Sequence, residues 1–292
     1  MALLSKLSSF INLTKPRIML LVGVTGATGL FMEGSLLSDP LRFSLAMLAL
    51  LLAGGSANAF NQYFEREIDA KMERTKARRP LPLHQIHPWQ ALEFSIVIGA
   101  AAIVIFTLEF NLLSSLLSAA TILFYGLFYT LWLKPRTHLN IVIGGAAGAM
   151  APLITWAAAS GSLTWEPVVL FLIIFFWTPA HFWALALCFK EDYKKVGLPM
   201  LPNVKGDKET VRQIVLYTFW TVAFSLLLLI SQTGWLYFVA AVASGIIFIA
   251  KVADLRKHPE TKVAYGVFGY SIVYLFVLFV ALAADSIFYL KI

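Results

Sequence analysis

Five stretches of this sequence are each longer than 20 residues and contain no Asp, Glu, Lys or Arg. They are Phe43–Phe64, Phe110–Leu133, Pro167–Phe189, Gln213–Ala250 and Val263–Ala284. A helix needs roughly 20 apolar residues to cross a bilayer, and in lipid a spanning segment must satisfy its own backbone. Charged residues make up 13% of the chain, whereas a soluble domain has about 25%. We therefore predict an all-α polytopic membrane protein.

The apolar pattern predicts nine membrane spans. The run Gln213–Ala250 is 38 residues long, which is too long for one span, and Ser231–Gly234 supplies a break. Glu93 makes the third span the hardest to assign. The expected spans are about 17–35, 43–63, 88–108, 112–133, 139–160, 166–188, 212–231, 235–252 and 264–285.

Lys and Arg residues orient these spans, because basic residues concentrate in cytoplasmic loops. With the N-terminus inside and the C-terminus outside, 21 of the 23 bases face the cytoplasm, and only Arg42 and Lys291 do not. We expect one domain over residues 1–292, with long cytoplasmic loops at 64–87 and 189–211. The net charge of +7 follows from these basic loops, and nothing else indicates nucleic-acid binding. The single cysteine, Cys188, excludes an internal disulfide and a multi-cysteine metal site.

The second span leads directly into a charged segment. Asn61, Glu65, Asp69 and Glu73 recur at every fourth residue, so on one helix they would form a single stripe. Carboxylates at the mouth of a membrane helix can hold a hard cation such as Mg²⁺, and nearby bases can hold the phosphate oxygens that it bridges. A solvated helix end with ordinary i,i+4 ion pairs explains the same pattern. The bases that follow are Lys71, Arg74, Lys76, Arg78 and Arg79.

His181 lies about two turns inside the end of the sixth span, where an ionisable residue indicates function. Its imidazole could ligate iron or another metal, or shuttle protons. A packing histidine bonded to a backbone carbonyl is the alternative. Its neighbours Trp177, Phe182 and Trp183 could line a flat apolar pocket or form an interfacial aromatic belt.

Several motifs resemble the UbiA superfamily of intramembrane prenyltransferases. The segment Asn61-Gln-Tyr-Phe-Glu-Arg-Glu-Ile-Asp69, with Arg79-Pro-Leu-Pro82 after it, is similar to the first acidic motif of that superfamily. Further stretches resemble the members that farnesylate haem. These are Leu13-Thr-Lys-Pro-Arg17, Asn140–Met150, Trp177-Thr-Pro-Ala-His-Phe-Trp-Ala-Leu-Ala186 with Asp192-Tyr193, and Pro199-Met-Leu-Pro202.

The resemblance implies a nine-helix fold around a central cavity open to the cytoplasm, in the inner (plasma) membrane. Its implied substrates are farnesyl diphosphate and haem b, its implied cofactor is Mg²⁺, and the product would pass to a haem A synthase or to oxidase assembly. Asn61, Glu65 and Asp69 would be the catalytic and metal-binding residues, with Asp192 as a further ligand. His181 and Trp183 would bind haem. The diphosphate would be held by Arg74, Lys76, Arg78, Lys134, Lys190, Lys194 and Lys195.

Two positions depart from the pattern of the aromatic prenyltransferases in the superfamily. Gln62 and Glu65 stand where they usually carry aspartates. Their second motif has two aspartates four residues apart, whereas Asp192 is followed by Val196 at that spacing. These departures leave open whether one or two Mg²⁺ bind, and Lys190, Lys194 and Lys195 could replace part of the charge of a second ion.

Two other functions fit parts of the sequence. A quinone-type aromatic prenyltransferase would share the fold and would not need His181. A cation-coupled transporter or channel could use the acidic stripe, but it predicts ionisable residues near the bilayer midplane. Here the ionisable residues concentrate at one face.

Overall fold

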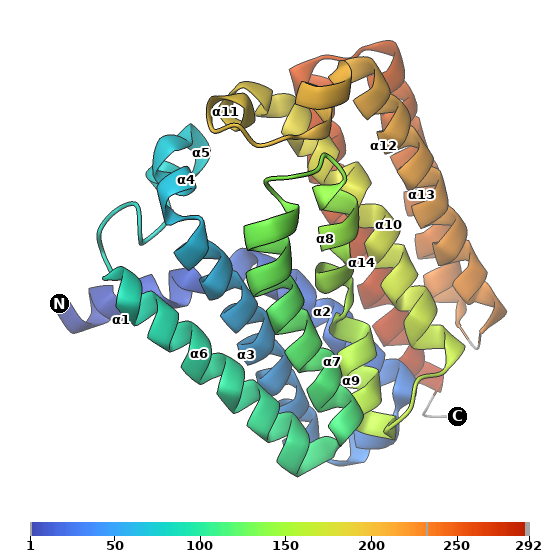
Figure 1. The fold of residues 1–292 in the computed structure, drawn as a ribbon. Coiled ribbons are helices and arrows are strands. Elements are labelled where there is room, and N and C mark those ends of the chain that lie inside the picture. Colours follow the sequence, from blue (N-terminus) through green and yellow to red (C-terminus); the bar gives the residue numbers. More distant parts are fainter. Residues whose placement is uncertain (1, 232, 290–292) are drawn as a thin grey trace.

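The computed structural model describes residues 2–231 and 233–289, and within them the chain is a bundle of long helices without a β-strand (Figure 1). Lys291, which the topology prediction places outside, lies beyond the described residues, as does Gln232 in the predicted break. A short helix, α1 (Ala2–Leu13), precedes the bundle.

Eight of the described helical segments are long and apolar enough to cross a membrane, so the chain is a multi-pass membrane protein. Each corresponds to a predicted span. They are α3 (Pro40–Phe64); α6 (Pro88–Ile105) continued by η2 (Phe106–Phe110); α7 (Leu112–Leu123) continued by η3 (Phe124–Leu133); α8 (Asn140–Ala149) with α9 (Ala151–Ser160); α10 (Trp165–Cys188); α12 (Leu201–Leu227) with η4 (Leu228–Ile230); α13 (Trp235–Lys257); and α14 (Thr261–Tyr289).

The ninth expected span, 17–35, forms the helix α2 (Pro16–Glu33) but is not among these eight. Its ends carry Arg17 and Glu33, and its buried side is rich in threonine and glycine. Thr28 Oγ1 donates to the Phe279 carbonyl of α14 at 3.1 Å, and Thr155 Oγ1 of α9 donates to the Gly26 carbonyl at 2.8 Å. These small residues let α2 pack closely between its neighbours.

Both predicted loops contain short helices, and these helices gather at one end of the bundle (Figure 1). Residues 64–87 contain α4 (Arg66–Lys71) and α5 (Glu73–Lys76). Residues 189–211 contain α11 (Lys190–Lys195), and α12 already begins at Leu201. The segment predicted as a loop to residue 211 is therefore helical from Leu201 on. The backbone kinks within this part of α12 at Gly206, where φ is 83°.

Helix α10 holds one half of the bundle together, because it packs against α8, α12 and α14. Leu170, Ile173, Ala180 and Ala184 are fully buried in the largest apolar cluster. Pro179 lies inside the helix without ending it. The faces of α10 therefore meet different partners, which decides where its predicted site residues point.

Candidate active site

The predicted acidic stripe forms only in part. The Glu65 N–H donates to the Asn61 carbonyl at 3.0 Å, and the Asp69 N–H donates to the Glu65 carbonyl at 2.8 Å. The one-turn spacing therefore continues from α3 into α4, and these three side chains share one face. Met72 is extended, with φ −91° and ψ 128°, and ends the regular spacing. Glu73 begins α5 with an exposed side chain, so its inclusion in the stripe was wrong.

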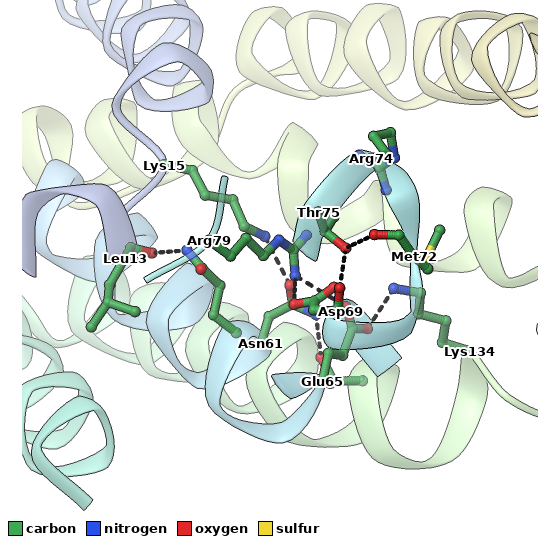
Figure 2. Close-up of polar contacts among 12 residues, drawn as sticks. Leu13, Lys15, Asn61, Glu65, Asp69, Met72, Arg74, Thr75, Arg79 and Lys134 are labelled. Atoms are coloured by element: carbon green, nitrogen blue, oxygen red, sulfur yellow. Dashed lines mark hydrogen bonds and ion pairs between the residues drawn. The ribbon is translucent and has the colours of Figure 1, made fainter. Parts of the chain in front are cut away.

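Three bases surround this face (Figure 2). Lys15 Nζ donates to Asn61 Oδ1 at 2.8 Å, and Lys134 Nζ donates to Glu65 Oε1 at 2.5 Å. The Arg79 guanidinium pairs with Asp69 and also lies 3.7 Å from Glu65 Oε2. We call Lys15, Asn61, Glu65, Asp69, Arg79 and Lys134 the ion cluster.

Lys15 and Arg79 were not predicted as site residues. Lys15 lies in the quoted motif Leu13–Arg17, and Arg79 lies at the end of the basic run. Those were the available signals, but neither indicates a position in space. Thr75 anchors the chain before Arg79, because its hydroxyl donates to the Asp69 carbonyl at 2.8 Å. This turn directs Arg79, rather than Arg78, at the carboxylates.

The carboxylates are deeply buried: 3% of Glu65 and 2% of Asp69 are exposed. Burial acts to raise the pKa of Glu65, but Lys134 and Arg79 outweigh it, so that pKa lies below its ordinary value. For Asp69 burial prevails over the opposing charge of Arg79, and nearby Glu65 adds to it, so the pKa is raised. Burial and the charge of Arg79 lower the pKa of Lys15.

Lys15 adopts a left-handed backbone conformation, with φ 56° and ψ 66°, directly before the proline that begins α2. A residue other than glycine in this region costs about 1–3 kcal/mol and persists where its surroundings hold it. The bond to Asn61 is such a restraint, and the ammonium also lies 5.9 Å from the Tyr125 ring centre. The backbone therefore delivers Lys15 into the cluster at an energetic cost.

Most of the other predicted diphosphate-binding bases lie at the same end of the bundle but outside the cluster. Arg74 stacks 5.9 Å from the Tyr193 ring. Lys76 and Lys195 pair with Glu73 at 2.5 Å and 3.5 Å. Lys190 pairs with Asp207 at 2.7 Å, and Arg78 and Lys194 are exposed. Of the seven predicted bases, the structure brings Lys134 alone into contact with the buried carboxylates.

Asp192 is directed at the backbone of α5. Its two carboxylate oxygens accept the N–H groups of Glu73 at 3.0 Å and Arg74 at 3.1 Å. It thus holds the start of α5 instead of joining Glu65 and Asp69. Within the described residues, no group of three His, Cys, Asp or Glu side chains is placed to hold a metal. The ion cluster instead offers two carboxylates and the Asn61 amide oxygen, which are the hard oxygen donors that suit Mg²⁺.

His181 of α10 packs against α14. Its ring stacks between those of Trp177, at 4.3 Å, and Phe268, at 4.5 Å. Its Nδ1 shares a 2.7 Å hydrogen bond with Ser271 Oγ. The ring also has a hydrogen bond with the Phe268 backbone, so the packing alternative, which expected a backbone carbonyl, fits the structure as well. Both ring faces are covered, so Nε2 is the atom left to bind anything further.

Trp183 leaves α10 toward α12, where its ring meets Tyr217 edge-on at 5.3 Å. It borders a cavity of about 390 Å³ between the start of α8, α10 and α12. Only 1% of Trp183 is exposed, and its indole N–H has no hydrogen-bond partner within the described part of the chain. The two residues predicted to bind haem therefore contact different helices.

Comparisons with known proteins agree with this architecture. The chain is 47% identical over 284 residues to the protoheme IX farnesyltransferase of Gloeobacter violaceus, covering 97% of this chain and 93% of the relative. A solved digeranylgeranylglyceryl phosphate synthase superposes with a TM-score of 0.79 at 22% identity, covering 97% of this chain and 99% of that one. A UbiA homologue from Archaeoglobus fulgidus bound to DMAPP and Mg²⁺ gives a TM-score of 0.63 at 14% identity, covering 94% and 99%.

The model of the UbiA prenyltransferase family matches residues 22–282, which include every helix from α3 to α13 and most of α2 and α14. The solved structures share the fold at low identity, and the curated relative shares nearly half of all residues along almost the whole chain. The chain therefore belongs to the UbiA prenyltransferase family, among its protoheme IX farnesyltransferases.

Proposed function

We propose that this protein transfers the farnesyl group of farnesyl diphosphate to a vinyl group of haem b and, with addition of water, forms haem O. The observation that carries this proposal is the buried ion cluster at the membrane end of α3. Its three bases face two carboxylates, which leaves a surplus positive charge where an anionic group can bind. The close sequence relationship to protoheme IX farnesyltransferases selects the acceptor.

The reaction begins with cleavage of the allylic C–O bond, whose electron pair leaves with the diphosphate. The vinyl π electrons then form the new C–C bond, and water adds to the resulting cation and releases a proton. Mg²⁺, held by Asn61, Glu65 and Asp69, would neutralise the diphosphate charge. Lys15, Arg79 and Lys134 would hold its oxygens by charge-assisted hydrogen bonds. The Archaeoglobus homologue, which has the same fold, was solved bound to DMAPP and Mg²⁺, and this supports the use of Mg²⁺.

The outer bases have a second place in this proposal. Arg74, Lys76, Arg78, Lys190, Lys194 and Lys195 surround the same end of the bundle, where they raise the local concentration of an anionic substrate. They do not contact the buried carboxylates, so each would contribute less than Lys15, Arg79 or Lys134. Asp192 would act by positioning α5. We also propose that residues 1–292 form a single domain and that this end of the bundle faces the cytoplasm.

On the acceptor side, we propose that His181 orients haem through Nε2. Ser271 and the two stacked rings fix the imidazole in one orientation. His181→Ala should then weaken haem binding and leave farnesyl diphosphate binding intact. Unchanged haem affinity together with unchanged turnover would reduce His181 to a packing residue.

We further propose nine spans, with α2 as the first, in the inner (plasma) membrane. Its buried contacts with α9 and α14 support α2 as part of the bundle. The basic asymmetry supports an inside N-terminus and an outside C-terminus. A C-terminal reporter that is active only in the cytoplasm would contradict this topology.

The experiment that tests the function uses purified full-length protein with farnesyl diphosphate, haem b and Mg²⁺. Mass spectrometry should find haem carrying one farnesyl group and one added water. A parallel reaction replaces haem with an aromatic quinone precursor. Prenylation of that precursor alone would support the aromatic prenyltransferase alternative. Absence of any transfer, with Mg²⁺ flux in proteoliposomes, would support the transporter.

A further inference from the structure

The cavity beside Trp183 has no role in the chemistry described above. It lies at the end of the bundle that carries the ion cluster, between the loop before α8 and the first turns of α12. Its volume, about 390 Å³, falls within the usual range for small-molecule sites. Tyr217 and Trp183 form an aromatic wall, and Leu201 adds apolar surface.

The polar groups of this cavity include an indole N–H, an imidazole, an ammonium and a carboxylate. The Trp183 indole N–H is buried and lacks a partner within the described residues, so a ligand that accepts a hydrogen bond there would relieve an energetic penalty. His138 is half-buried at the wall, with its imidazole free of hydrogen bonds among those residues. Lys205 supplies an exposed ammonium. Glu209 adds one negative charge, but its carboxylate is engaged by Arg212 at 3.2 Å and Gln213 at 2.7 Å.

A flat, largely apolar ligand that carries carboxylates and a metal ion matches these groups. We propose that this cavity is a docking site for haem b, distinct from His181, in which His138 ligates the iron and Lys205 pairs with a propionate. This inference rests on the proposed function, because that function makes haem the acceptor. A neutral imidazole is a common iron ligand, and a lysine ammonium is a natural partner for a carboxylate.

The cavity is also connected to the ion cluster. His138 lies in the same short loop as Lys134, whose ammonium pairs with Glu65. Asn140 binds this loop together, since its side-chain amide donates to the Lys134 carbonyl at 3.2 Å and to the Thr137 carbonyl at 2.7 Å. Haem docked against His138 would therefore lie close along the chain to the residues proposed to hold the diphosphate.

Gly206 divides the outer wall of the cavity into two parts. Leu201 and Lys205 line the cavity before it, and Gln213 and Tyr217 line the cavity after it. With φ 83° and ψ 169°, its backbone lies in a region that favours glycine, and a Cβ there would contact nothing within 4 Å. The conformation of Gly206 therefore sets the angle between the Leu201–Lys205 wall and the rest of α12.

The test is a titration of tag-free, full-length protein with haem b, followed by the Soret band, because a polyhistidine tag would itself bind haem. His138→Ala should weaken haem affinity at least tenfold, since even the loss of a group that only orients a metal ligand costs about 10–100-fold, and should shift the Soret maximum. The matched control is His258→Ala, which removes an exposed imidazole outside the cavity. Farnesyl diphosphate binding, measured by calorimetry, should be the same in all three proteins.

Metal-free protoporphyrin IX separates the iron contact from the propionate contact. Its binding should be insensitive to His138→Ala but weakened by Lys205→Gln, with exposed Lys208→Gln as the control. If wild-type protein binds haem and both cavity variants bind it equally well, the docking site is wrong and the proposed function stands. If wild-type protein shows no saturable haem binding, the choice of haem as acceptor fails with it.

Discussion

Two membrane helices of this protein end in similar charged segments, but the structure treats them differently. Helix α3 leads into Glu65 and Asp69, which are 3% and 2% exposed and contact the half-buried bases Arg79 and Lys134. Helix α10 leads into α11, where Glu191, Lys194 and Lys195 are exposed. The sequence pattern is alike, with acids and bases after an apolar run, so the pattern alone does not indicate which segment forms a site.

The difference shows how the second segment supports the first. Asp192 of α11 holds the backbone of α5, and Tyr193 underlies Arg74. The turn between α4 and α5 in turn directs Arg79 at Asp69. Burying a charged group costs several kcal/mol, even when its partner is well placed. The burial of the α3 segment agrees with our proposal that it carries the chemistry and that the α11 segment positions it.

The largest difference between the two segments is expected when one acid in each is neutralised and turnover is measured. Asp69→Asn keeps the side-chain shape but removes a buried charge and a proposed Mg²⁺ ligand. We expect turnover to fall about 10²–10³-fold, the scale of losing one group that stabilises developing charge, and Asp69→Ala to abolish it. Glu191→Gln in the exposed segment should leave turnover within about twofold.

Turnover and membrane insertion are measured together for both variants, with product formation followed at saturating Mg²⁺. Asp69→Asn protein that inserts normally and retains full activity would remove Asp69 from the proposed site. A large loss in Glu191→Gln would contradict the division of roles between the two segments.

The sequence predicted which acidic and amide side chains of the α3 segment lie together, but it did not predict two of the bases that contact them. The spacing of four residues was enough to predict that Asn61, Glu65 and Asp69 share one face, because helical hydrogen bonds continue across Glu65. It could not foresee the extended backbone at Met72, which separates Glu73 from the stripe and brings Arg79 into it. Lys15 enters through a left-handed residue that no periodicity predicts.

The helices themselves were largely predictable, because uncharged runs have few alternatives in a membrane. Eight predicted spans match the structure, and the ninth, α2, is a helix that carries Arg17 and Glu33 at its ends. What each face of α10 contacts was not predictable. His181 and Trp183 are two residues apart, but they meet α14 and α12 respectively, and that depends on long-range packing.

A second comparison uses one lysine from each region. Lys134→Met removes the ammonium that lies 2.5 Å from buried Glu65 and leaves Arg79, at 3.7 Å, as the remaining base beside it. Removing one partner of a buried ion pair costs up to about 3–5 kcal/mol. We expect a clearly lower unfolding temperature in detergent and a higher KM for farnesyl diphosphate. Lys194→Met, in the exposed segment, should change stability by no more than about 0.5 kcal/mol. If Lys134→Met and Lys194→Met changed the unfolding temperature and KM equally, burial would not explain the difference between the α3 and α11 segments.

The smallest expected effect distinguishes positioning from metal binding at Asp192. Asp192→Asn keeps one carbonyl oxygen for the N–H groups of Glu73 and Arg74 but loses the charge, and hydrogen bonds to charged groups contribute about 1.5–3 kcal/mol each. If Asp192 only holds α5, KM for farnesyl diphosphate should rise several-fold, while the Mg²⁺ concentration for half-maximal turnover stays near that of the wild type. If Asp192 is a metal ligand, that Mg²⁺ concentration should rise as it does in Asp69→Asn. A Mg²⁺ titration of the wild type, Asp192→Asn and Asp69→Asn at saturating farnesyl diphosphate decides between these outcomes. Only the loss of a metal ligand should raise the Mg²⁺ concentration that half-maximal turnover requires.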